Sequence, residues 1–326
     1  MTTPTTSLRV VTYNVWFFGG FQKPPVFDKK NLIGGKSEKE LAMMKLSNIN
    51  TYDFEERMNA VIQECLKCDA DVVCLQEMTH WSKEIFEKHK ALASNYEFSF
   101  DIQGRYGIGM LVRKGIRVEK FQVTNMRSYM GRNLLHCVVM KNSKRIHIAT
   151  AHFESLSNAK LRREQLKTAN EVASSYKKPW IPSILSSVKG CSASILCGDF
   201  NFCSYRNYSG TGPLENLVLK EVTPEFVDLW PALKREKKSK KESDVDDGFS
   251  TPDKKKQREE LGYTFDSKTN TNIKKFERMR YDRIMLRTFC GDDVVAESIE
   301  LIGTDEIKEI KKHPSDHYGL FARFLL

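Results

Sequence analysis

The 326-residue chain lacks any apolar stretch long enough to cross a membrane. No run of about 18 uninterrupted apolar residues occurs, so we expect neither a membrane-spanning helix nor a membrane partner. The N-terminal residues MTTPTTSLRV also lack the charged and apolar regions of a secretory signal. These absences exclude an integral membrane protein with helical spans and argue against secretion.

The chain also lacks a cysteine framework. Eight cysteines are too few to cross-link a chain of this length, and Cys74, Cys137 and Cys197 lie inside apolar runs. They resemble small buried residues of a reducing compartment. Cys65 and Cys68 form a C-x-x-C, but no second pair at metal-binding spacing accompanies it, so we expect neither a zinc nor a redox site there.

Basic residues outnumber acidic ones in this chain. Lysine and arginine number 52 against 42 acidic residues, a net charge of +10 that favours a polyanionic partner. Much of the excess lies in two stretches, and solvated lysines that serve solubility are an equal alternative.

The hydrophobic content of 40% suffices for a large core. Two segments have the spacing of helices, Phe54–Leu66 and Asn158–Tyr176, the second with Ser157 and Asn158 as possible N-caps. Strand-like apolar runs alternate with them, which predicts an α/β layered fold. These runs are Leu8–Tyr13, Asp71–Leu75, Gly107–Val112, Leu134–Met140, Ile146–Ala151, Ser194–Cys197, Tyr281–Leu286 and Tyr318–Phe324.

Two segments interrupt this pattern. Residues 23–50 mix Pro, Gly, Lys and Ser, and we expect a long surface loop with a short helix. Residues 234–260 are almost free of apolar side chains and predict a disordered insertion with basic and acidic stretches. Its KREKKSKK start has three interpretations: a nuclear-localisation patch, a phosphate-binding arm or a solvated loop. No boundary divides the chain, so we expect a single domain over 1–326.

Polar residues lie at the ends of several apolar runs. Each alone has an ordinary explanation as a turn former or a hydrogen-bonded core residue. Together they predict a site along one edge of a central sheet, where open α/β sheets place their sites. The residues are Asn14, Glu77, His152, Asp199, Asn201, Asp282, Asp316 and His317.

This set suits the hydrolysis of a phosphodiester with one hard cation. Glu77 offers oxygen ligands to Mg²⁺, which takes only one or two protein carboxylates. Asp199 is placed to accept a proton from water, with Asn201 holding that water. His317, held in one tautomer by Asp282, would donate to a phosphoryl oxygen.

Four short motifs carry a resemblance to a known family. TYN at 12–14, LQE at 75–77, GDFN at 198–201 and PSDH at 314–317 occur in the order found in the endonuclease/exonuclease/phosphatase superfamily. The resemblance implies a four-layer sandwich, with two facing mixed β-sheets flanked by helices, and dependence on Mg²⁺ or Mn²⁺.

Longer segments narrow the resemblance. AHFESLSNAKLRREQL at 151–166, FVDLWPAL, YTFDSKTNTN, RMRYDRIML and HPSDHYGL are similar to consecutive segments of the tyrosyl-DNA phosphodiesterase 2 enzymes of that superfamily. The implied reaction is hydrolysis of the bond between a 5′ DNA phosphate and a tyrosine of topoisomerase II. The implied partners are DNA with a 5′-tyrosyl adduct at a single-stranded end and a topoisomerase II-derived peptide, in the nucleus, the cytoplasm or both.

The resemblance also implies roles by position. Catalytic roles fall to Asp199, His317, Asn14, Asn201 and Asp282. Glu77 would hold the metal, with Asp316 as a second candidate ligand. His152 and Ser155 would line the approach of the DNA strand, and Phe265 would offer a ring on which a base stacks.

Three positions depart from the family pattern. Trp16 replaces an acid, which removes a possible outer metal ligand and leaves a ring as a candidate substrate contact. Phe265 replaces a tryptophan and is a smaller stacking platform. Cys203 replaces an arginine, so one phosphate contact is missing or comes from Arg206 or elsewhere. An N-terminal ubiquitin-binding module usual in these enzymes is missing, so we expect a catalytic domain alone. Other substrates stay open, among them those of a related Mg-dependent nuclease, an RNA 3′-exonuclease or a lipid phosphodiesterase, as does an inactive relative that binds nucleic-acid ends or a protein.

Overall fold

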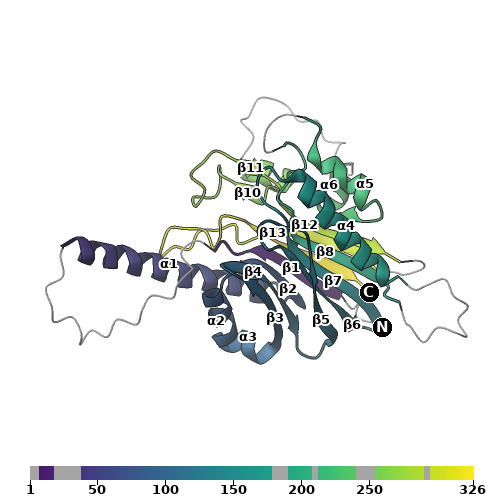
Figure 1. The fold of residues 1–326 in the computed structure, drawn as a ribbon, viewed down its shortest axis with the longest axis horizontal. Coiled ribbons are helices and arrows are strands. Elements are labelled where there is room, and N and C mark those ends of the chain that lie inside the picture. Colours follow the sequence, from purple (N-terminus) through teal and green to yellow (C-terminus); the bar gives the residue numbers. More distant parts are fainter. Residues whose placement is uncertain (1–6, 18–37, 178–189, 208–211, 240–253, 290–293) are drawn as a thin grey trace, which may run out of the picture.

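Two six-stranded mixed β-sheets face each other in the computed structural model, which describes residues 7–17, 38–177, 190–207, 212–239, 254–289 and 294–326 (Figure 1). The first sheet has the order β13 (Val295–Ile302), β14 (Gly319–Leu325), β1 (Ser7–Asn14), β2 (Val72–Met78), β4 (Tyr106–Arg113) and β3 (Tyr96–Gln103). The second has the order β5 (Arg117–Asn125), β6 (Asn133–Lys141), β7 (Lys144–His152), β8 (Ala193–Asp199), β12 (Asp282–Thr288) and β9 (Val227–Asp228). A two-stranded hairpin pairs β10 (Phe265–Asp266) with β11 (Arg278–Met279). All eight predicted strands are present.

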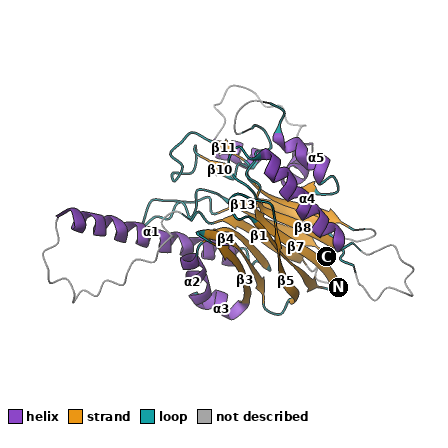
Figure 2. Cartoon of the chain, in the orientation of Figure 1, coloured by secondary structure: helices purple, strands orange, loops and turns teal. Residues whose placement is uncertain are grey.

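The helices of the described chain are α1 (Glu38–Lys67), α2 (His80–Lys88), α3 (Lys90–Asn95), α4 (Ala159–Ser175), α5 (Val218–Val222), α6 (Leu229–Ser239) and α7 (Lys254–Leu261), with a 3₁₀ turn at Glu215–Leu217. Helices α1, α2 and α3 pack on the outer face of the first sheet, and α4 and α5 pack on that of the second (Figures 1 and 2). Helix α1 begins well before its predicted start at Phe54, so residues 38–50 are helical. Residues 23–37 lie outside the described part of the chain.

The three largest hydrophobic cores of the described residues confirm the predicted four layers. The largest lies between the sheets and joins side chains such as Val10 of β1 and Ile148 of β7. A second packs α1, α2 and α3 on the first sheet, and a third packs α4 and α5 on the second. In α4, Leu166, Ala169 and Ala173 are buried, as the helical spacing requires, whereas the N-cap residue Asn158 makes no side-chain cap hydrogen bond.

The segment 234–260 differs from the expected disordered insertion at both ends. Residues 234–239 belong to α6, whose Leu229 and Trp230 are buried in the main core. Residues 254–260 belong to α7, where Arg258 is buried against the ring of Tyr318. Helix formation is coupled here to contacts made by neighbouring residues, which the local composition does not reveal. Residues 240–253 lie outside the described residues.

Two findings on the described ranges concern apolar helices and cysteines. No helix there combines the length and apolarity that a bilayer crossing requires. Every cysteine described is a free thiol. Cys65 of α1 is buried in the core between that helix and the first sheet. Burial raises the pKa of Cys68 to about 12, which suits an inert thiol rather than a reactive one.

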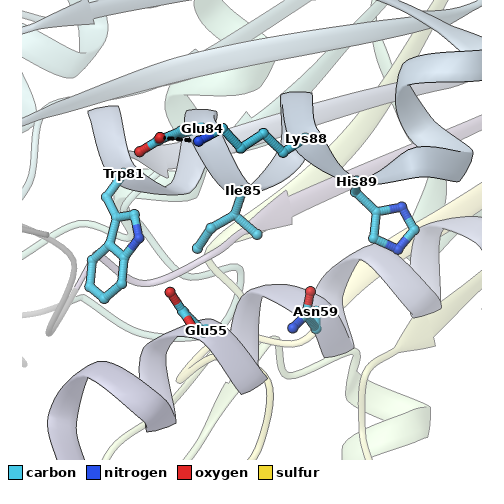
Figure 3. Close-up of a pocket in the computed structure, with 7 residues that line it drawn as sticks. All are labelled: Glu55, Asn59, Trp81, Glu84, Ile85, Lys88 and His89. Carbon is cyan, nitrogen blue, oxygen red and sulfur yellow. Dashed lines mark hydrogen bonds and ion pairs between the residues drawn. The ribbon is translucent and has the colours of Figure 1, made fainter. Parts of the chain in front are cut away.

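A cavity of about 290 Å³ lies between α1 and α2 (Figure 3). Glu55 and Asn59 face it from α1, and Trp81 and Ile85 face it from α2, where Glu84 pairs with Lys88. His89 completes the lining. None of these residues belongs to the predicted site.

Candidate active site

Strand pairing brings the polar strand ends together. β1 and β2 run parallel, so Asn14 lies opposite Gln76 and next to Glu77. In the second sheet, the parallel pairing of β7 with β8 sets His152 opposite Asp199, and antiparallel β12 sets Asp282 opposite Asp199 as well. The site therefore lies where the edges of two sheets meet, rather than along one edge of a single central sheet as we expected.

Gly198 makes this convergence possible. Its φ of +135° is accessible to few residues other than glycine, and a Cβ atom there would lie 2.0 Å from the carbonyl oxygen of Ala151. The close approach of β7 and β8 at this point sets His152 beside Asp199. Gly198 thus allows the chain to turn out of β8 and also allows β8 to lie close to β7.

Backbone strain gathers at the site. Trp16, Glu77 and Asn201 have φ values of +58°, +60° and +55°, a left-handed conformation that costs a non-glycine residue of order 1–3 kcal/mol. Glu77 also lies at a register shift of β2 against β4, between Gln76 and Met78. Such a bulge re-aims one side chain, and it directs the Glu77 carboxylate toward Asn14.

The Asn14 amide links two carboxylates. Its Nδ2 donates to Glu77 Oε1 at 3.2 Å and to Asp199 Oδ2 at 3.0 Å. Glu77 Oε2 accepts from the backbone N–H of Phe17, and Asp199 Oδ1 accepts from that of Asn201. Asn14 therefore holds one carboxylate from each sheet at a fixed separation.

A second chain of contacts passes through His317. Its Nδ1 lies 2.7 Å from Asp282 Oδ2, and its Nε2 lies 3.9 Å from Asp199 Oδ2. Burial alone would lower the pKa of His317, but the charge of Asp282 and the hydrogen bond to it outweigh burial and hold that pKa well above its usual value. His317 is thus an imidazolium that donates to Asp282 and presents its second N–H toward Asp199.

His152 lies on the other side of Asp199, and its imidazole is neutral. Its Nδ1 lies 3.1 Å from Nη1 of Arg132, which can only donate, so the His152 proton resides on Nε2, 3.5 Å from Asp199 Oδ2. Burial, with the charge of Arg132, lowers the pKa of His152 well below its usual value. Arg132 also donates from Nη2 to Ser155 Oγ at 3.0 Å.

Burial and the charges of neighbouring carboxylates raise the pKa values of Asp199, Asp316 and Glu77. Burial raises the pKa of Asp199 to about 6 and that of Asp316 to about 7, and repulsion from Asp282 and from Glu77, respectively, adds to the rise. Burial also raises the pKa of Glu77, with a further contribution from Asp199. Asp282 Oδ1 is buried without a hydrogen-bond partner.

These observations fit a divalent cation. Asp199, Asp282 and His317 lie within 4.8 Å of one another, but the protonated His317 has no lone pair for a metal. Carboxylate oxygens, those of Glu77 and Asp316 among them, are therefore the ligands available to a cation. Buried oxygen donors that repel each other, one of them unpartnered, suit a hard cation such as Mg²⁺.

Comparison with known proteins agrees with this geometry. The model of the Endonuclease/Exonuclease/phosphatase family matches residues 11–317, a range that contains every motif of the site. The chain belongs to the endonuclease/exonuclease/phosphatase family. This confirms the resemblance seen in the sequence.

The relatives narrow the likeness within the family. Tyrosyl-DNA phosphodiesterase 2 of Xenopus laevis is 26% identical over 285 residues, which cover 86% of this chain and 64% of that protein. The Danio rerio protein of that name is 24% identical over 303 residues, covering 89% of this chain and 69% of its own length. The chain thus spans about two thirds of the length of these curated relatives.

Solved structures share the fold. The crystal structure titled D. rerio TDP2 complexed with single strand DNA product superposes with a TM-score of 0.64 at 20% identity, covering 98% of this chain and all of that one. A truncated Caenorhabditis elegans TDP2 gives 0.64 at 19% identity over 98% of each chain. The human Nocturnin catalytic domain gives 0.55 at 12% identity, covering 98% of this chain and 94% of that one.

The site includes arginines that the sequence alone did not indicate. Arg132 directly precedes β6, and the antiparallel pairing that sets Leu134 opposite Ala151 brings Arg132 to His152 at the end of β7. Arg57 of α1 is buried and donates to the carbonyl oxygens of Val15 and Pro314, tying the end of β1 to the loop before Asp316. Burial lowers the pKa of Arg57 to about 10, against the opposing charge of Asp316.

Of the remaining predicted residues, Phe265 and Trp16 lie beside the site, whereas Arg206 does not join its hydrogen-bond network. The Phe265 ring lies 5.1 Å from the ring of His317, beside the site. Trp16 donates its backbone N–H to Asn14 Oδ1, and the Arg57 guanidinium lies 4.5 Å from its ring. Arg206 is exposed and donates to the hydroxyl of Tyr263, so it is not joined to this network by its hydrogen bond.

Proposed function

We propose that this chain is a metal-dependent phosphodiesterase that hydrolyses 5′-phosphotyrosyl DNA adducts to 5′-phosphate ends. The observation that carries the proposal is the placement of Asp199 between an imidazolium, His317, and a neutral imidazole, His152, all buried at one sheet junction. The likeness to the tyrosyl-DNA phosphodiesterase 2 relatives supports the choice of substrate.

Asp199 acts as the base for the attacking water. With a pKa of about 6 it is ionised at neutral pH, and Asn14 and Asn201 fix its two oxygens. Water attacks phosphorus, its proton passes to Asp199, and the bond from phosphorus to the tyrosine oxygen breaks. Positioned general bases contribute roughly 10²–10⁴ to a rate.

His317 stabilises charge on the phosphoryl group. Its Nδ1–H is committed to Asp282, which leaves the Nε2–H as a donor for a phosphoryl oxygen. Glu77 and Asp316 would hold the cation, which supplies Lewis-acid stabilisation of the phosphoryl and leaving oxygens when bound.

Arg132 supports an anionic substrate. Arg132 is 5% exposed, and among the described residues the hydrogen-bond partners of its guanidinium are the neutral side chains of His152, Ser155 and Met130. A buried cation without a balancing anion is costly unless an anion joins it. A phosphodiester oxygen would provide that charge.

A panel of oligonucleotides tests the proposal. It contains 5′-tyrosyl, 3′-tyrosyl, abasic and ribonucleotide substrates, each with Mg²⁺ and with a chelator. We expect the 5′-tyrosyl substrate to be converted to a 5′-phosphate end only with Mg²⁺. Fast hydrolysis of another substrate with the tyrosyl adduct left intact would retain the phosphodiesterase and reject the substrate.

A further inference from the structure

The loop that carries Arg132 has no regular structure of its own. It connects β5 to β6 over residues 126–132, and its tip exposes Tyr129. A long charged side chain at the end of such a loop loses considerable conformational freedom when it is fixed. Some part of the molecule must therefore hold the loop if Arg132 is to meet a phosphate at a defined place.

Ser128 organises the loop from within. Its hydroxyl oxygen accepts hydrogen bonds from the backbone N–H groups of Met130 and Arg132, both at 2.9 Å. The same hydroxyl donates its proton to Glu154 Oε2 at 2.6 Å. The backbone of Arg132 is thus connected to Glu154 through one hydroxyl group.

Glu154 is fully buried, and both of its carboxylate oxygens accept hydrogen bonds from the loop or from α4. Its Oε1 accepts the backbone N–H of Tyr129 at 3.0 Å, and its Oε2 accepts Gln165 Nε2 at 3.1 Å as well as the Ser128 hydroxyl. Gln165 in turn accepts the backbone N–H of Glu154 at 2.8 Å and donates to the carbonyl oxygen of Arg127 at 2.9 Å.

The chain places this carboxylate directly beside the site. Glu154 lies between His152 and Ser155, the two side chains that receive the Arg132 guanidinium. One short segment therefore fixes Arg132 at both ends: its backbone through Glu154 and its guanidinium through His152 and Ser155.

We propose that Glu154, acting through Ser128, is a positioning residue that sets the Arg132 guanidinium for phosphate binding. The inference rests on the proposed function for the identity of the anion. A carboxylate suits this place because it only accepts, and every group facing its two oxygens donates. A carboxamide in its place would put an NH₂ group, which cannot accept, next to a hydrogen-bond donor, so at least one of these hydrogen bonds would be lost.

The test uses Glu154→Gln and Ser128→Ala in the full chain. Each is measured for affinity to a 5′-phosphorylated oligonucleotide by fluorescence anisotropy, for KM and kcat on the tyrosyl substrate, and for Tm. We expect about a tenfold loss of affinity and a rise in KM of similar size, with kcat changed far less. Ser128→Thr keeps the hydroxyl and should restore affinity. Glu171→Gln, at an exposed position of α4, is the control and should change neither.

A double-mutant cycle decides whether Glu154 acts through Arg132. In an Arg132→Ala background, Glu154→Gln should cause no further loss of affinity for the 5′-phosphorylated oligonucleotide. A full additional loss in that background would overturn the proposal, as would a fall in kcat and Tm with affinity and KM unchanged. Because affinity is measured without turnover, a chain that binds the phosphate as expected but leaves tyrosyl adducts intact would reject the proposed function alone.

Discussion

The two histidines beside Asp199 differ because their partners differ. His317 faces the carboxylate of Asp282 and stays protonated, whereas His152 faces the guanidinium of Arg132 and stays neutral. Both are buried to a similar degree, so the sign of the neighbouring charge decides the protonation state. Asp199 between them is therefore offered one strong and one weak hydrogen-bond donor.

Asp199→Asn tests the assignment of the base. The change removes the charge and the proton acceptor, and we expect turnover to fall by at least about 10²-fold. Binding of a 5′-phosphorylated oligonucleotide should persist, because Arg132 is untouched. Anisotropy and single-turnover kinetics measure the two effects, with Asp305→Asn on the exposed surface as control. Unchanged turnover would show that another group activates the water.

At the scale of elements, the junction depends on how closely β7 and β8 approach. The parallel register sets Ala151 against Gly198 and His152 against Asp199, so the same contact that closes the sheet also assembles the site. The bulge at Glu77 plays the corresponding part in the first sheet. Each sheet thus uses one irregular position to aim a carboxylate.

Gly198→Ala should separate the two strands. The added methyl would overlap the Ala151 carbonyl, and overpacking of this kind costs about 1–3 kcal/mol. We expect a lower urea midpoint and a loss of activity that exceeds the loss of stability. Gly115→Ala is the control, because Gly115 also has a positive φ, +90°, but its Cβ would meet open space. Equal destabilisation of both variants would assign the cost to φ rather than to the strand contact.

A buried histidine pair on β6 and β7 makes stability depend on pH. His147 Nε2 lies 3.4 Å from His136 Nδ1, its Nδ1 lies 2.8 Å from Ser194 Oγ, and Tyr176 stacks on its ring. Burial lowers the pKa of His147 to about 3. Only the unfolded chain takes up this proton between pH 6.5 and 3, so the stability present above pH 6.5 is lost as pH falls below it.

The expected loss between pH 7 and pH 5 is about 2 kcal/mol from His147 alone. Urea unfolding at the two pH values measures it, and His147→Gln, which cannot titrate, should reduce the difference between them. The exposed His80→Gln is the control and should leave it unchanged. A variant and parent with the same pH dependence would exclude His147 as the source.

At the scale of the whole molecule, the site joins residues from Asn14 to His317, close to both ends of the described chain. Both sheets and the loops between them must be in place before the carboxylates of Glu77 and Asp199 share one amide. The net charge of +10 adds a long-range attraction for a polyanion that no single contact provides.

Salt dependence measures that attraction. If basic side chains neutralise about four phosphates of a single strand, log affinity should fall with log salt at a slope of about −3. Anisotropy with a 5′-phosphorylated oligonucleotide between about 50 and 200 mM salt would then show a loss of about 50-fold. A flat response would argue against a nucleic-acid substrate.

The sequence by itself determined the strands and the polar residues at their ends. Runs such as Leu134–Met140 and Ser194–Cys197 are mostly apolar because both faces of the strand are buried, and this signal is local. The order of the motifs was enough to identify the family. Asp199 and His317 belong to two of those motifs, so the sequence alone is sufficient to select them as candidates.

Only the tertiary structure decided which of these residues meet and in what charge state. The role of Arg132 depends on the antiparallel pairing of β6 with β7, and the direction of the Glu77 carboxylate depends on a bulge in β2. Strand pairing brings together residues that are far apart in the chain. The neighbours and the burial that result then set the protonation state of each titratable side chain. Local patterns contain no such information, because a side chain's charge depends on its neighbours in space.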